Sequence, residues 1–555
     1  MVTSSPMSSP STISQKPEKE NGKERERVAE EEQEAERQHA SMAIAPDMTD
    51  VEKTLPRETT ALQRTVSGPP YSVFSPGMKS WIIFLVSISA LISPFGATLV
   101  LPALTVLTDV LDITPTQANI SITTYMIAQA IAPAIIGAMS DTSGRRLSFI
   151  LCYVIYIVAN VGLALQTNYI ALLLLRMMQA VGCSAAIALA FAIVSDISTS
   201  AERGKYMGYA GAGILCGPAF GPTIGGILSQ YLGWRAIFWF LAIFAGVLLV
   251  LFVLLFPETC RNVVGNGSIP PQGVNRSVVS CVQARRLAKQ SSAVEKEQDE
   301  NTTPAKRNIS LNPLATLNIL LEKESGIILL YNGFFFTGMM MTTSSIPTLF
   351  KEAYNLSELD IGLCYIASGI GSLLSSLTMG HVVDWNFRRH AALQGMQITK
   401  GKQQDLSNFS VERVKLEIVL PGHITGILGL ILFGWTVKFQ THLVGPEIAL
   451  FVIGFGVSTA FNITNGLLID LHRDKPAAAT AAINFVRCLM SAGGSAAVIP
   501  MCRAMNPGWA FTFIGLVYVV LILAVLWIMR NGLRWRQEAT EAARRRRSAV
   551  LEQRM

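Results

Sequence analysis

Twelve apolar segments, each about 20 residues long and nearly free of charge, dominate this sequence. A helix of that length can cross the roughly 30 Å hydrocarbon core of a bilayer. The chain is 50% hydrophobic and only 15% charged, whereas soluble domains carry about 25% charged residues. The sequence therefore predicts an all-α membrane protein whose twelve segments are transmembrane helices.

The predicted spans form two groups of six, separated by a polar stretch. The first group is Trp81–Pro102, Ile120–Met139, Leu147–Gln166, Tyr169–Val194, Tyr206–Gln230 and Ala236–Phe256. The second group is Gly326–Leu349, Ile361–Val383, Ile418–Thr436, Ile448–Ile469, Ala477–Met501 and Ala510–Met529. We expect a disordered N-terminal tail, two six-helix bundles, a central loop and a basic C-terminal tail. The tail is residues 1–75, the first bundle 76–257, the central loop 258–325, the second bundle 326–530 and the C-terminal tail 531–555.

A ten-residue charged patch occurs twice, once in each group of spans. The first copy, Gly137–Arg146, reads GAMSDTSGRR, and the second, Gly380–Arg389, reads GHVVDWNFRR. With the glycines aligned, both copies place an aspartate four residues later and an arginine pair eight and nine residues later. One charged patch repeated in one hydrophobic context indicates an internally duplicated membrane protein.

The loop charges predict the orientation of the chain. If the N-terminus is inside, the short inner loops carry twelve Lys and Arg residues and the outer loops carry four. Basic residues gather on the cytoplasmic side of membrane proteins, so we expect both termini and both charged patches to be cytoplasmic. The polar N-terminus predicts no cleavable signal peptide. The net charge of +7 lies mainly in loops beside apolar spans and does not indicate nucleic-acid binding.

The first charged patch resembles the signature loop of major facilitator superfamily transporters, and the resemblance covers about Trp81–Met529. It implies twelve helices in two pseudo-symmetric bundles and a cytoplasmic gate that forms in one state and breaks in the other. The implied gate residues are Gly137, Asp141, Gly144, Arg145, Arg146, Asp384 and Arg388. The alternative is that the arginines only fix topology. The second copy has Phe387 where the first has Gly144, which weakens the parallel.

The fifth span carries a stripe of glycines interrupted by two prolines. Small residues spaced by four let a neighbouring helix approach closely, and prolines remove backbone hydrogen bonds. The pattern resembles the antiporter motif of exporters in this superfamily; an ordinary packing seam is the alternative. Its residues are Gly213, Gly217, Pro218, Gly221, Pro222 and Gly225.

Several polar side chains within the spans are candidates for binding substrate or coupling ions. Arginine inside a membrane is costly and usually faces a cavity or a partner, although Arg176 could also snorkel toward the outer surface. A resemblance of Arg176 to a family motif in the fourth span is imperfect, because Ala180 replaces the expected glycine. The candidates are Tyr125, Gln129, Arg176, Gln179, Asn332, Asn462, Asn465, Asn484 and Arg487. For each one, plain helix packing is the alternative.

No Asp or Glu lies well inside a predicted span, so no residue can be named as the proton carrier. Two deep arginines without deep acids favour an anionic cargo. The sequence shows no metal-ligand cluster, no cofactor motif, no phosphate-binding loop and no catalytic constellation. We therefore expect neither an enzyme nor an ATP-driven pump, and no metal or cofactor. A membrane sensor that does not transport is a further alternative.

Segments such as AERGKYMGY, LGWRAIFWF and PETCRNVVGNGSIPP resemble fungal twelve-span drug:proton antiporters, in particular the quinidine-resistance and citrate-exporter branches. The resemblance implies a monomeric efflux pump for small organic molecules in a fungal plasma membrane, with proton antiport and multidrug resistance as typical functions. Export of an organic acid such as a di- or tricarboxylate is the alternative. Nutrient import by proton symport is a weaker one, because the glycine–proline stripe is typical of exporters.

Overall fold

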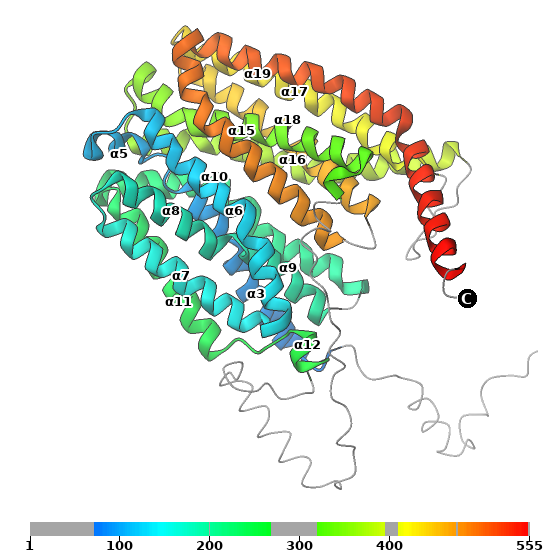
Figure 1. Ribbon diagram of the computed structural model, residues 1–555. Coiled ribbons are helices and arrows are strands. Elements are labelled where there is room, and N and C mark those ends of the chain that lie inside the picture. Colours follow the sequence, from blue (N-terminus) through cyan, green and yellow to red (C-terminus); the bar gives the residue numbers. More distant parts are fainter. Residues whose placement is uncertain (1–71, 199, 268–318, 395–408, 473–475, 553–555) are drawn as a thin grey trace, which may run out of the picture. The chain divides into compact units, whose positions relative to one another are not determined.

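The computed structural model describes residues 72–198, 200–267, 319–394, 409–472 and 476–552 (Figure 1). Contacts gather Tyr71–Met555 into one compact unit. The predicted N-terminal tail and most of the central loop lie outside the described residues. Every regular element of the described chain is helical, as the sequence predicts.

The first half of the described chain contains ten helices. They are α3 (Pro76–Ala90), α4 (Ile92–Thr98), α5 (Leu104–Leu111), α6 (Pro115–Ser143), α7 (Arg145–Leu165), α8 (Tyr169–Ser184), α9 (Ala186–Ile197), α10 (Ser200–Leu232), α11 (Arg235–Leu254) and α12 (Arg261–Val264). The first predicted span is thus divided at Leu91, and the fourth is divided at Ala185. Both breaks keep right-handed helical backbone, so each pair of helices follows one path across the bundle.

The second half contains five longer helices: α15 (Lys323–Tyr354), α16 (Glu358–Leu393), α17 (Val411–Lys438), α18 (Val444–Leu471) and α19 (Pro476–Glu552). Helix α19 includes two predicted spans, which meet at Asn506, where φ is 63° and ψ is 160°. Beyond the last predicted span the same helix continues through most of the basic tail (Figure 1).

Ten helices or helix pairs of the described chain are long and apolar enough to cross a membrane. Helix α10, with 33 residues, is not among them, and one of the ten contains both spans that meet at Asn506. With those two spans counted separately and α10 added, the described helices can be matched to the twelve predicted segments. Large apolar side chains on the outside of the helices, such as Ile135 and Leu523, are 66% exposed, as expected for surfaces that face lipid.

The two halves begin their second spans in the same way. Thr114 accepts from the backbone N–H of Gln117 at the start of α6, and the Gln117 side chain accepts from the N–H of Thr114. Ser357 and Asp360 form the same reciprocal capping box at the start of α16. The cap therefore repeats, as the charged patch does, in corresponding positions of the two halves.

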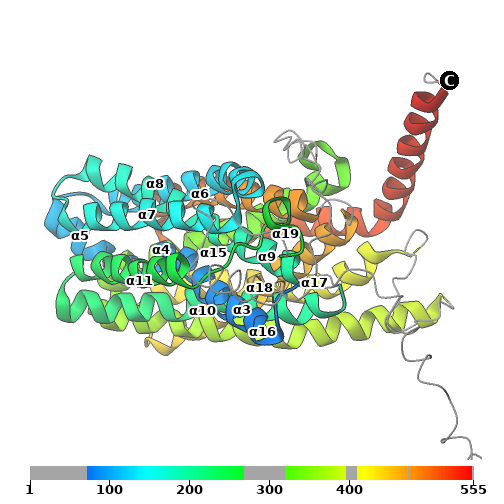
Figure 2. The ribbon, with the colours of Figure 1, turned by 90° about the horizontal axis from the view of Figure 1, so that it is seen from below.

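Each half packs mainly on itself. Helix α7 lies beside α11 in the first half, and α17 lies beside α18 in the second, as Figures 1 and 2 both show. Two helix pairs form most of the contact between the halves: α6 packs on α19, and α10 packs on α16. Helix α15 also touches α5 and α6. The candidate site residues are distributed along these two seams and around the helices next to them.

Candidate functional site

The first charged patch forms a one-residue turn between α6 and α7. Helix α6 ends at Ser143, α7 begins at Arg145, and Gly144 between them has φ 107° and ψ 152°. That positive φ is readily adopted only by glycine. The requirement explains the glycine of this motif from the backbone alone.

The charges of the patch are paired within the first half. The Arg145 guanidinium lies 2.5 Å from Asp141 and 3.0 Å from Asp196 at the end of α9. Arg145 is only 9% exposed, and Arg261 donates to the backbone carbonyl of Asp196. Two carboxylates around one buried guanidinium tie together the ends of α6, α7 and α9. Asp141 and Arg145, which the sequence predicts to be gate residues, thus belong to one network of ion pairs. Their gating role stays a prediction.

Arg146 bonds backbone carbonyls, whereas Arg145 pairs with carboxylates. Its side chain donates to the backbone carbonyls of Phe252 and Val253, at 3.2 and 2.6 Å, near the end of α11. Those carbonyls lie in the last turn of a helix, where cations are favoured. Gly137 has open space around its backbone. The patch therefore connects the ends of α6, α7, α9 and α11. The sequence predicted the loop between α6 and α7 but not its contacts with α9 and α11.

Sequence reasoning missed Glu258 as a site residue. Its buried carboxylate accepts from the backbone N–H groups of Arg145 and Arg146, at 2.9 and 3.2 Å, and from those of Thr259 and Cys260. It thus caps the start of α7, which has no side-chain cap of its own at Gly144. Burial raises the pKa of the neighbouring Cys260 thiol to about 11. Glu258 lies in the PETCRN segment, which supports the family resemblance. That resemblance was the one sequence signal that could have pointed to Glu258.

The second charged patch has a different backbone from the first. Helix α16 runs without a turn to Leu393, through Phe387, the position where the first copy has a positive-φ glycine. Asp384 and Arg388 lie on this extended helix and are exposed. The polar contacts are made instead by Asn386 and His390, which bond Glu417 of α17 at 3.3 and 2.7 Å. The gating role of the second copy stays a prediction, and its geometry does not repeat that of the first.

The glycine stripe of α10 faces α4. A β-carbon at Gly217 would meet the Pro94 side chain, and one at Gly225 would meet the backbone carbonyl of Leu99. Gly221 faces Thr98, and Pro222 is buried, whereas Pro218 is exposed. Gly213 also lies in α10. The stripe is therefore a close-packing seam between the first and fifth spans, as small residues spaced by four allow.

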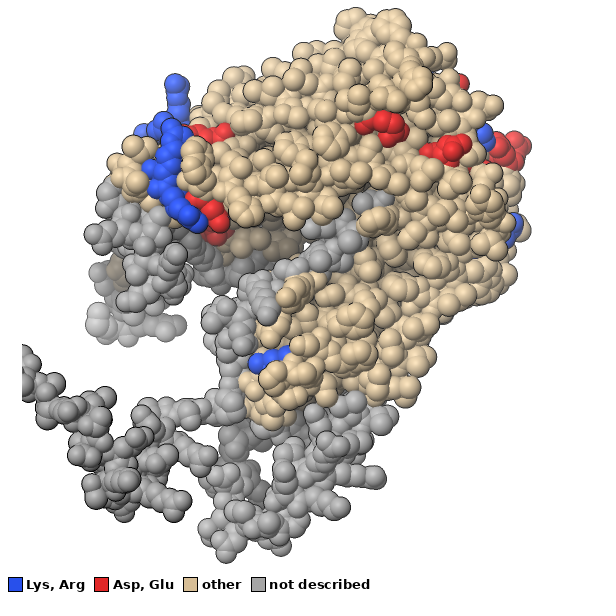
Figure 3. All heavy atoms as spheres, turned by 180° about the vertical axis from the view of Figure 1, so that it is seen from behind, with Lys and Arg blue, Asp and Glu red and all other residues tan. Residues whose placement is uncertain are grey.

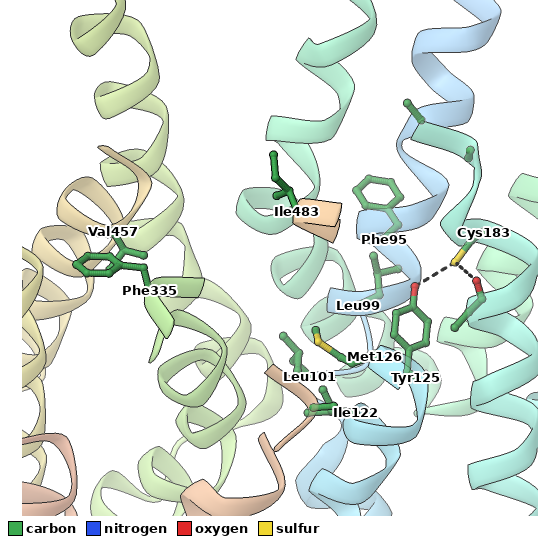
Figure 4. Packing of buried hydrophobic residues seen from close by; sticks show 14 of the residues in the cluster. Phe95, Leu99, Leu101, Ile122, Tyr125, Met126, Cys183, Phe335, Val457 and Ile483 are labelled. Atoms are coloured by element: carbon green, nitrogen blue, oxygen red, sulfur yellow. Dashed lines mark hydrogen bonds between the residues drawn. The ribbon is translucent and has the colours of Figure 1, made fainter. Parts of the chain in front are cut away.

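Arg176 lies inside the first bundle and does not snorkel. It is 1% exposed, and its Nη1 donates to the Gly96 carbonyl at 2.9 Å and to the Gln179 side chain at 2.6 Å. Its guanidinium carbon lies 4.6 Å from the centre of the Tyr125 ring. Figure 4 shows the other side of Tyr125, whose hydroxyl points to Cys183 at 3.0 Å. Nε and Nη2 of Arg176 are buried without a hydrogen-bond partner.

Gln129 and Asn484 join the two halves. The Asn484 side chain, on α19, donates to the Gln129 backbone carbonyl at 3.2 Å, and the Gln129 side chain donates to Ser93 at 3.3 Å. Arg487 donates to Asn484 at 2.6 Å and, unlike Arg176, is partly exposed. The two arginines that sequence reasoning treated alike thus lie in different surroundings.

The asparagines of α15 and α18 lie together in the second bundle. Asn332 donates to Thr464 at 2.8 Å and to Asn465 at 3.0 Å, and its own Oδ1 is buried without a partner. Asn462 is exposed and donates to Ser376 of α16 at 3.1 Å. Among the described residues, no group of three or more His, Cys, Asp or Glu side chains could hold a metal ion.

The polar contacts between the halves lie away from the charged turn. Thr123 of α6 bonds the Ala492 carbonyl of α19, Thr223 of α10 bonds the Gly362 carbonyl of α16, and Lys351 pairs with Asp109 at 3.1 Å. Thr123 lies in the part of α6 that begins at Pro115, whereas the charged turn follows Ser143 at the other end of that helix. In Figure 3 the surfaces of the two bundles meet at one end and stand apart at the other. The Thr123 contact between the halves thus lies on the part of α6 away from the charged turn.

A model of the Major Facilitator Superfamily matches residues 86–495. The chain belongs to the major facilitator superfamily. Its superfamily relatives include the MFS-type transporter phiD of Fungal sp. (strain ATCC 74256), 40% identical over 85% of this chain and 71% of that one. The MFS-type transporter tstD of Talaromyces stipitatus is 36% identical over 87% of both chains. Citrate exporter 1 of Aspergillus niger is 34% identical over 89% of this chain and 93% of that one.

Solved structures agree with this superfamily fold. The xylose transporter XylE from E. coli, in a partially occluded inward open conformation, aligns with a TM-score of 0.57 over 82% of this chain and 98% of that one, at 16% identity. The predicted fold class, all-α with the major facilitator architecture, is confirmed. This chain is thus a multi-pass membrane protein of a superfamily whose members here are named as transporters.

Proposed function

We propose that this chain is a secondary active exporter of small organic molecules, such as drugs, toxins or secondary metabolites, that works by alternating access. The observation that carries the proposal is the polar seam of Gln129, Asn484 and Arg487, where side chains of the two bundles meet. A partly exposed cation between two bundles is a place where cargo can bind while the bundles rock.

The charged turn fits the part of a cytoplasmic gate. Among the described residues, Arg145 forms ion pairs with Asp141 and Asp196, both in the first half. Closing this end would bring the second half against the turn and give its charges new partners. A network that changes partners between two conformations biases the equilibrium between them. If the turn is cytoplasmic, this end of the bundles faces the cell interior, where an exporter loads its cargo.

The direction of transport rests on the α10 seam and on a relative. The glycine–proline stripe resembles the antiporter motif of exporters, and it packs closely on α4. Citrate exporter 1 is named as an exporter. Proton antiport is the coupling we propose, although no carboxylate of the described spans can be assigned as its carrier. Import by proton symport is the competing direction.

We also propose a monomer in the fungal plasma membrane with both termini in the cytoplasm. The excess of Lys and Arg in the loops that hold both charged patches supports this orientation. On that basis the domains are the N-terminal tail, 1–75, the bundles 76–257 and 326–530, the central loop 258–325 and the C-terminal tail 531–555.

An untargeted comparison of metabolites inside and outside cells with and without the protein tests the function. Export predicts that the cargo accumulates inside cells that lack the protein, and proton antiport predicts that a protonophore abolishes the difference. Cargo that falls inside those cells would instead indicate import. An unchanged difference in the presence of the protonophore would contradict proton coupling and leave export standing.

The second candidate function is export of an organic acid anion, such as a di- or tricarboxylate. Arg487 favours an anionic cargo in general, because no carboxylate of the described residues forms an ion pair with this partly exposed cation. The name of the Aspergillus niger relative agrees with it. A competition assay in membrane vesicles between citrate and a lipophilic cation of similar size separates the two functions.

A further inference from the structure

We propose that Arg487, Phe336 and Phe461 form the anion subsite of the transport pathway and that it selects a flat organic monocarboxylate. The inference rests on the proposed transport function and names the substrate class of its site. Of the two arginines in the spans, Arg487 is the one that would bind the carboxylate of the cargo. The Phe336 and Phe461 rings would select a flat cargo.

The Arg487 guanidinium lies against aromatic rings of two other helices. Its central carbon is 4.6 Å from the centre of the Phe336 ring on α15 and 5.8 Å from that of Phe461 on α18. The two rings are themselves 5.4 Å apart, at 38°. Rings over the flat face of a guanidinium stabilise its charge without using its N–H groups. The edge of the group is thus left for hydrogen bonding.

The edge of the Arg487 guanidinium has an N–H donor without an acceptor. Nη2 donates to Asn484 at 2.6 Å, whereas Nε is buried without any partner. A carboxylate matches the fork geometry of a guanidinium and accepts two N–H bonds at once. The unpartnered Nε is therefore an observation that points to a ligand, and the charge of Arg487 gives the sign of that ligand.

The location of Arg487 is the second argument. Its partner Asn484 also donates to Gln129 of the other bundle, so the cation sits one hydrogen bond from the seam. Arg487, Phe336 and Phe461 are all partly exposed. Arg176, by contrast, is 1% exposed and is enclosed by Gly96, Gln179 and Tyr125 of its own bundle. A cargo at the seam between the bundles is therefore nearer to the exposed part of Arg487 than to the enclosed Arg176.

The neighbouring side chains indicate the shape of the cargo. Asn332 and Phe336 lie four residues apart on α15, and Phe461 and Asn465 lie four apart on α18, so the two helices carry a pair of facing rings and a pair of bonded amides. The rings favour a flat unsaturated body, and the free Oδ1 of Asn332 can accept from a hydroxyl. One accessible cation balances one carboxylate, whereas a tricarboxylate would bring two further charges into a low-dielectric site.

Binding to the purified full-length protein at neutral pH tests the assignment. The probes are 1-naphthoate, cyclohexanecarboxylate, which has the same charge without a flat ring, 1-naphthylmethylammonium, which has the opposite charge, and citrate. We expect 1-naphthoate to bind most tightly of the four. Arg487→Gln should weaken 1-naphthoate about tenfold or more, because hydrogen bonds to charged groups are lost. Arg503→Gln is the matched control on the same helix, since Arg503 is exposed, and it should leave binding unchanged.

Two more variants keep the test decisive. Phe336→Leu should reduce the preference for 1-naphthoate over cyclohexanecarboxylate while retaining binding of both anions. If Arg487→Gln does not fold, Arg487→Lys keeps the charge and should still weaken 1-naphthoate, because an ammonium lacks the flat face and the fork. The proposal is overturned if Arg487 variants bind 1-naphthoate as the wild type does, if the ammonium or citrate binds as tightly, or if no anion binds.

The binding assay needs no direction of transport, so the two proposals fail separately. Arg487-dependent binding of 1-naphthoate by a protein that exports nothing from cells would refute the exporter and leave the subsite intact. Export from cells that is unaffected by Arg487→Gln would refute the subsite and leave the exporter intact.

Discussion

Replacing Glu258 with alanine should destabilise the charged turn more than any change in the turn's own exposed residues. The Glu258 carboxylate is 2% exposed and accepts four backbone N–H groups, from Arg145, Arg146, Thr259 and Cys260, at 2.8 to 3.2 Å. Alanine would leave the N–H groups of the first turn of α7 without their acceptor. A buried donor left unpaired costs about 1–3 kcal/mol, so the two from α7 together cost about 2–6 kcal/mol if water does not replace the carboxylate.

Glu258→Gln separates the hydrogen bonds from the side-chain volume. A glutamine oxygen can stand where Oε1 accepts from Arg145, Thr259 and Cys260, but the amide nitrogen would then face the N–H of Arg146. One of the two α7 N–H groups then loses its acceptor instead of both, so we expect about 1–3 kcal/mol, roughly half of the effect of Glu258→Ala.

The measurements are the apparent melting temperature of the purified protein in one detergent and the amount of protein in the membrane. Glu352→Ala is the control, because Glu352 is 58% exposed and its ion pair with Arg503 is 3.9 Å long. An exposed pair of that kind contributes little to stability. We expect the order wild type and Glu352→Ala, then Glu258→Gln, then Glu258→Ala. Equal melting of Glu258→Ala and wild type would refute the capping argument.

Three further predictions concern the seams and the charge network. Gly217→Leu should abolish transport and lower the amount of protein, while Gly246→Leu, at a glycine where an added β-carbon would meet no neighbouring helix or side chain within 4 Å, should do neither; a fully active Gly217→Leu protein would contradict the close packing of α10. Asp141→Asn removes one of two carboxylates from Arg145, so turnover should slow with 1-naphthoate affinity unchanged, and the reverse result would place Asp141 in the binding site. Arg176→Ala should reduce both abundance and transport, as judged by membrane level and export, since it empties a fully buried site; normal abundance would show that Arg176 is not structural.

The helices of this protein were predictable because lipid demands long apolar segments, and their number and order agree with the sequence. The ends were less predictable. Helix α16 extends ten residues past the predicted end at Val383 because Phe387, unlike Gly144, does not favour the positive φ of the first turn. Both copies of the patch have aspartate and arginine at matching positions. The first copy turns at Gly144, whereas the second continues as a helix through Phe387.

The partners of the site residues were beyond the reach of sequence reasoning. Arg176 and Arg487 each have an amide three residues away on the same helix, so the local pattern cannot tell which arginine is enclosed. Their surroundings come from other helices: Tyr125 for the first and Phe336 for the second. Glu258 was missed for the same reason, because its partners at Arg145 and Arg146 are more than a hundred residues away.

Helices α10 and α16 touch through their backbones where Gly362 faces the Pro222 carbonyl and Gly226 faces the backbone of Glu358. Gly362 and Gly226 have no side chains to interlock, and the Thr223 hydroxyl bonds the Gly362 carbonyl there, so the contact can act as a fulcrum on which one bundle tilts with little repacking. From Gly362 the lever arm to Leu393 is 31 residues of α16, or about 46 Å at 1.5 Å per residue. A tilt of roughly 10° at the fulcrum would then displace the far end of α16 by about 8 Å, enough to open or shut a passage for a small molecule.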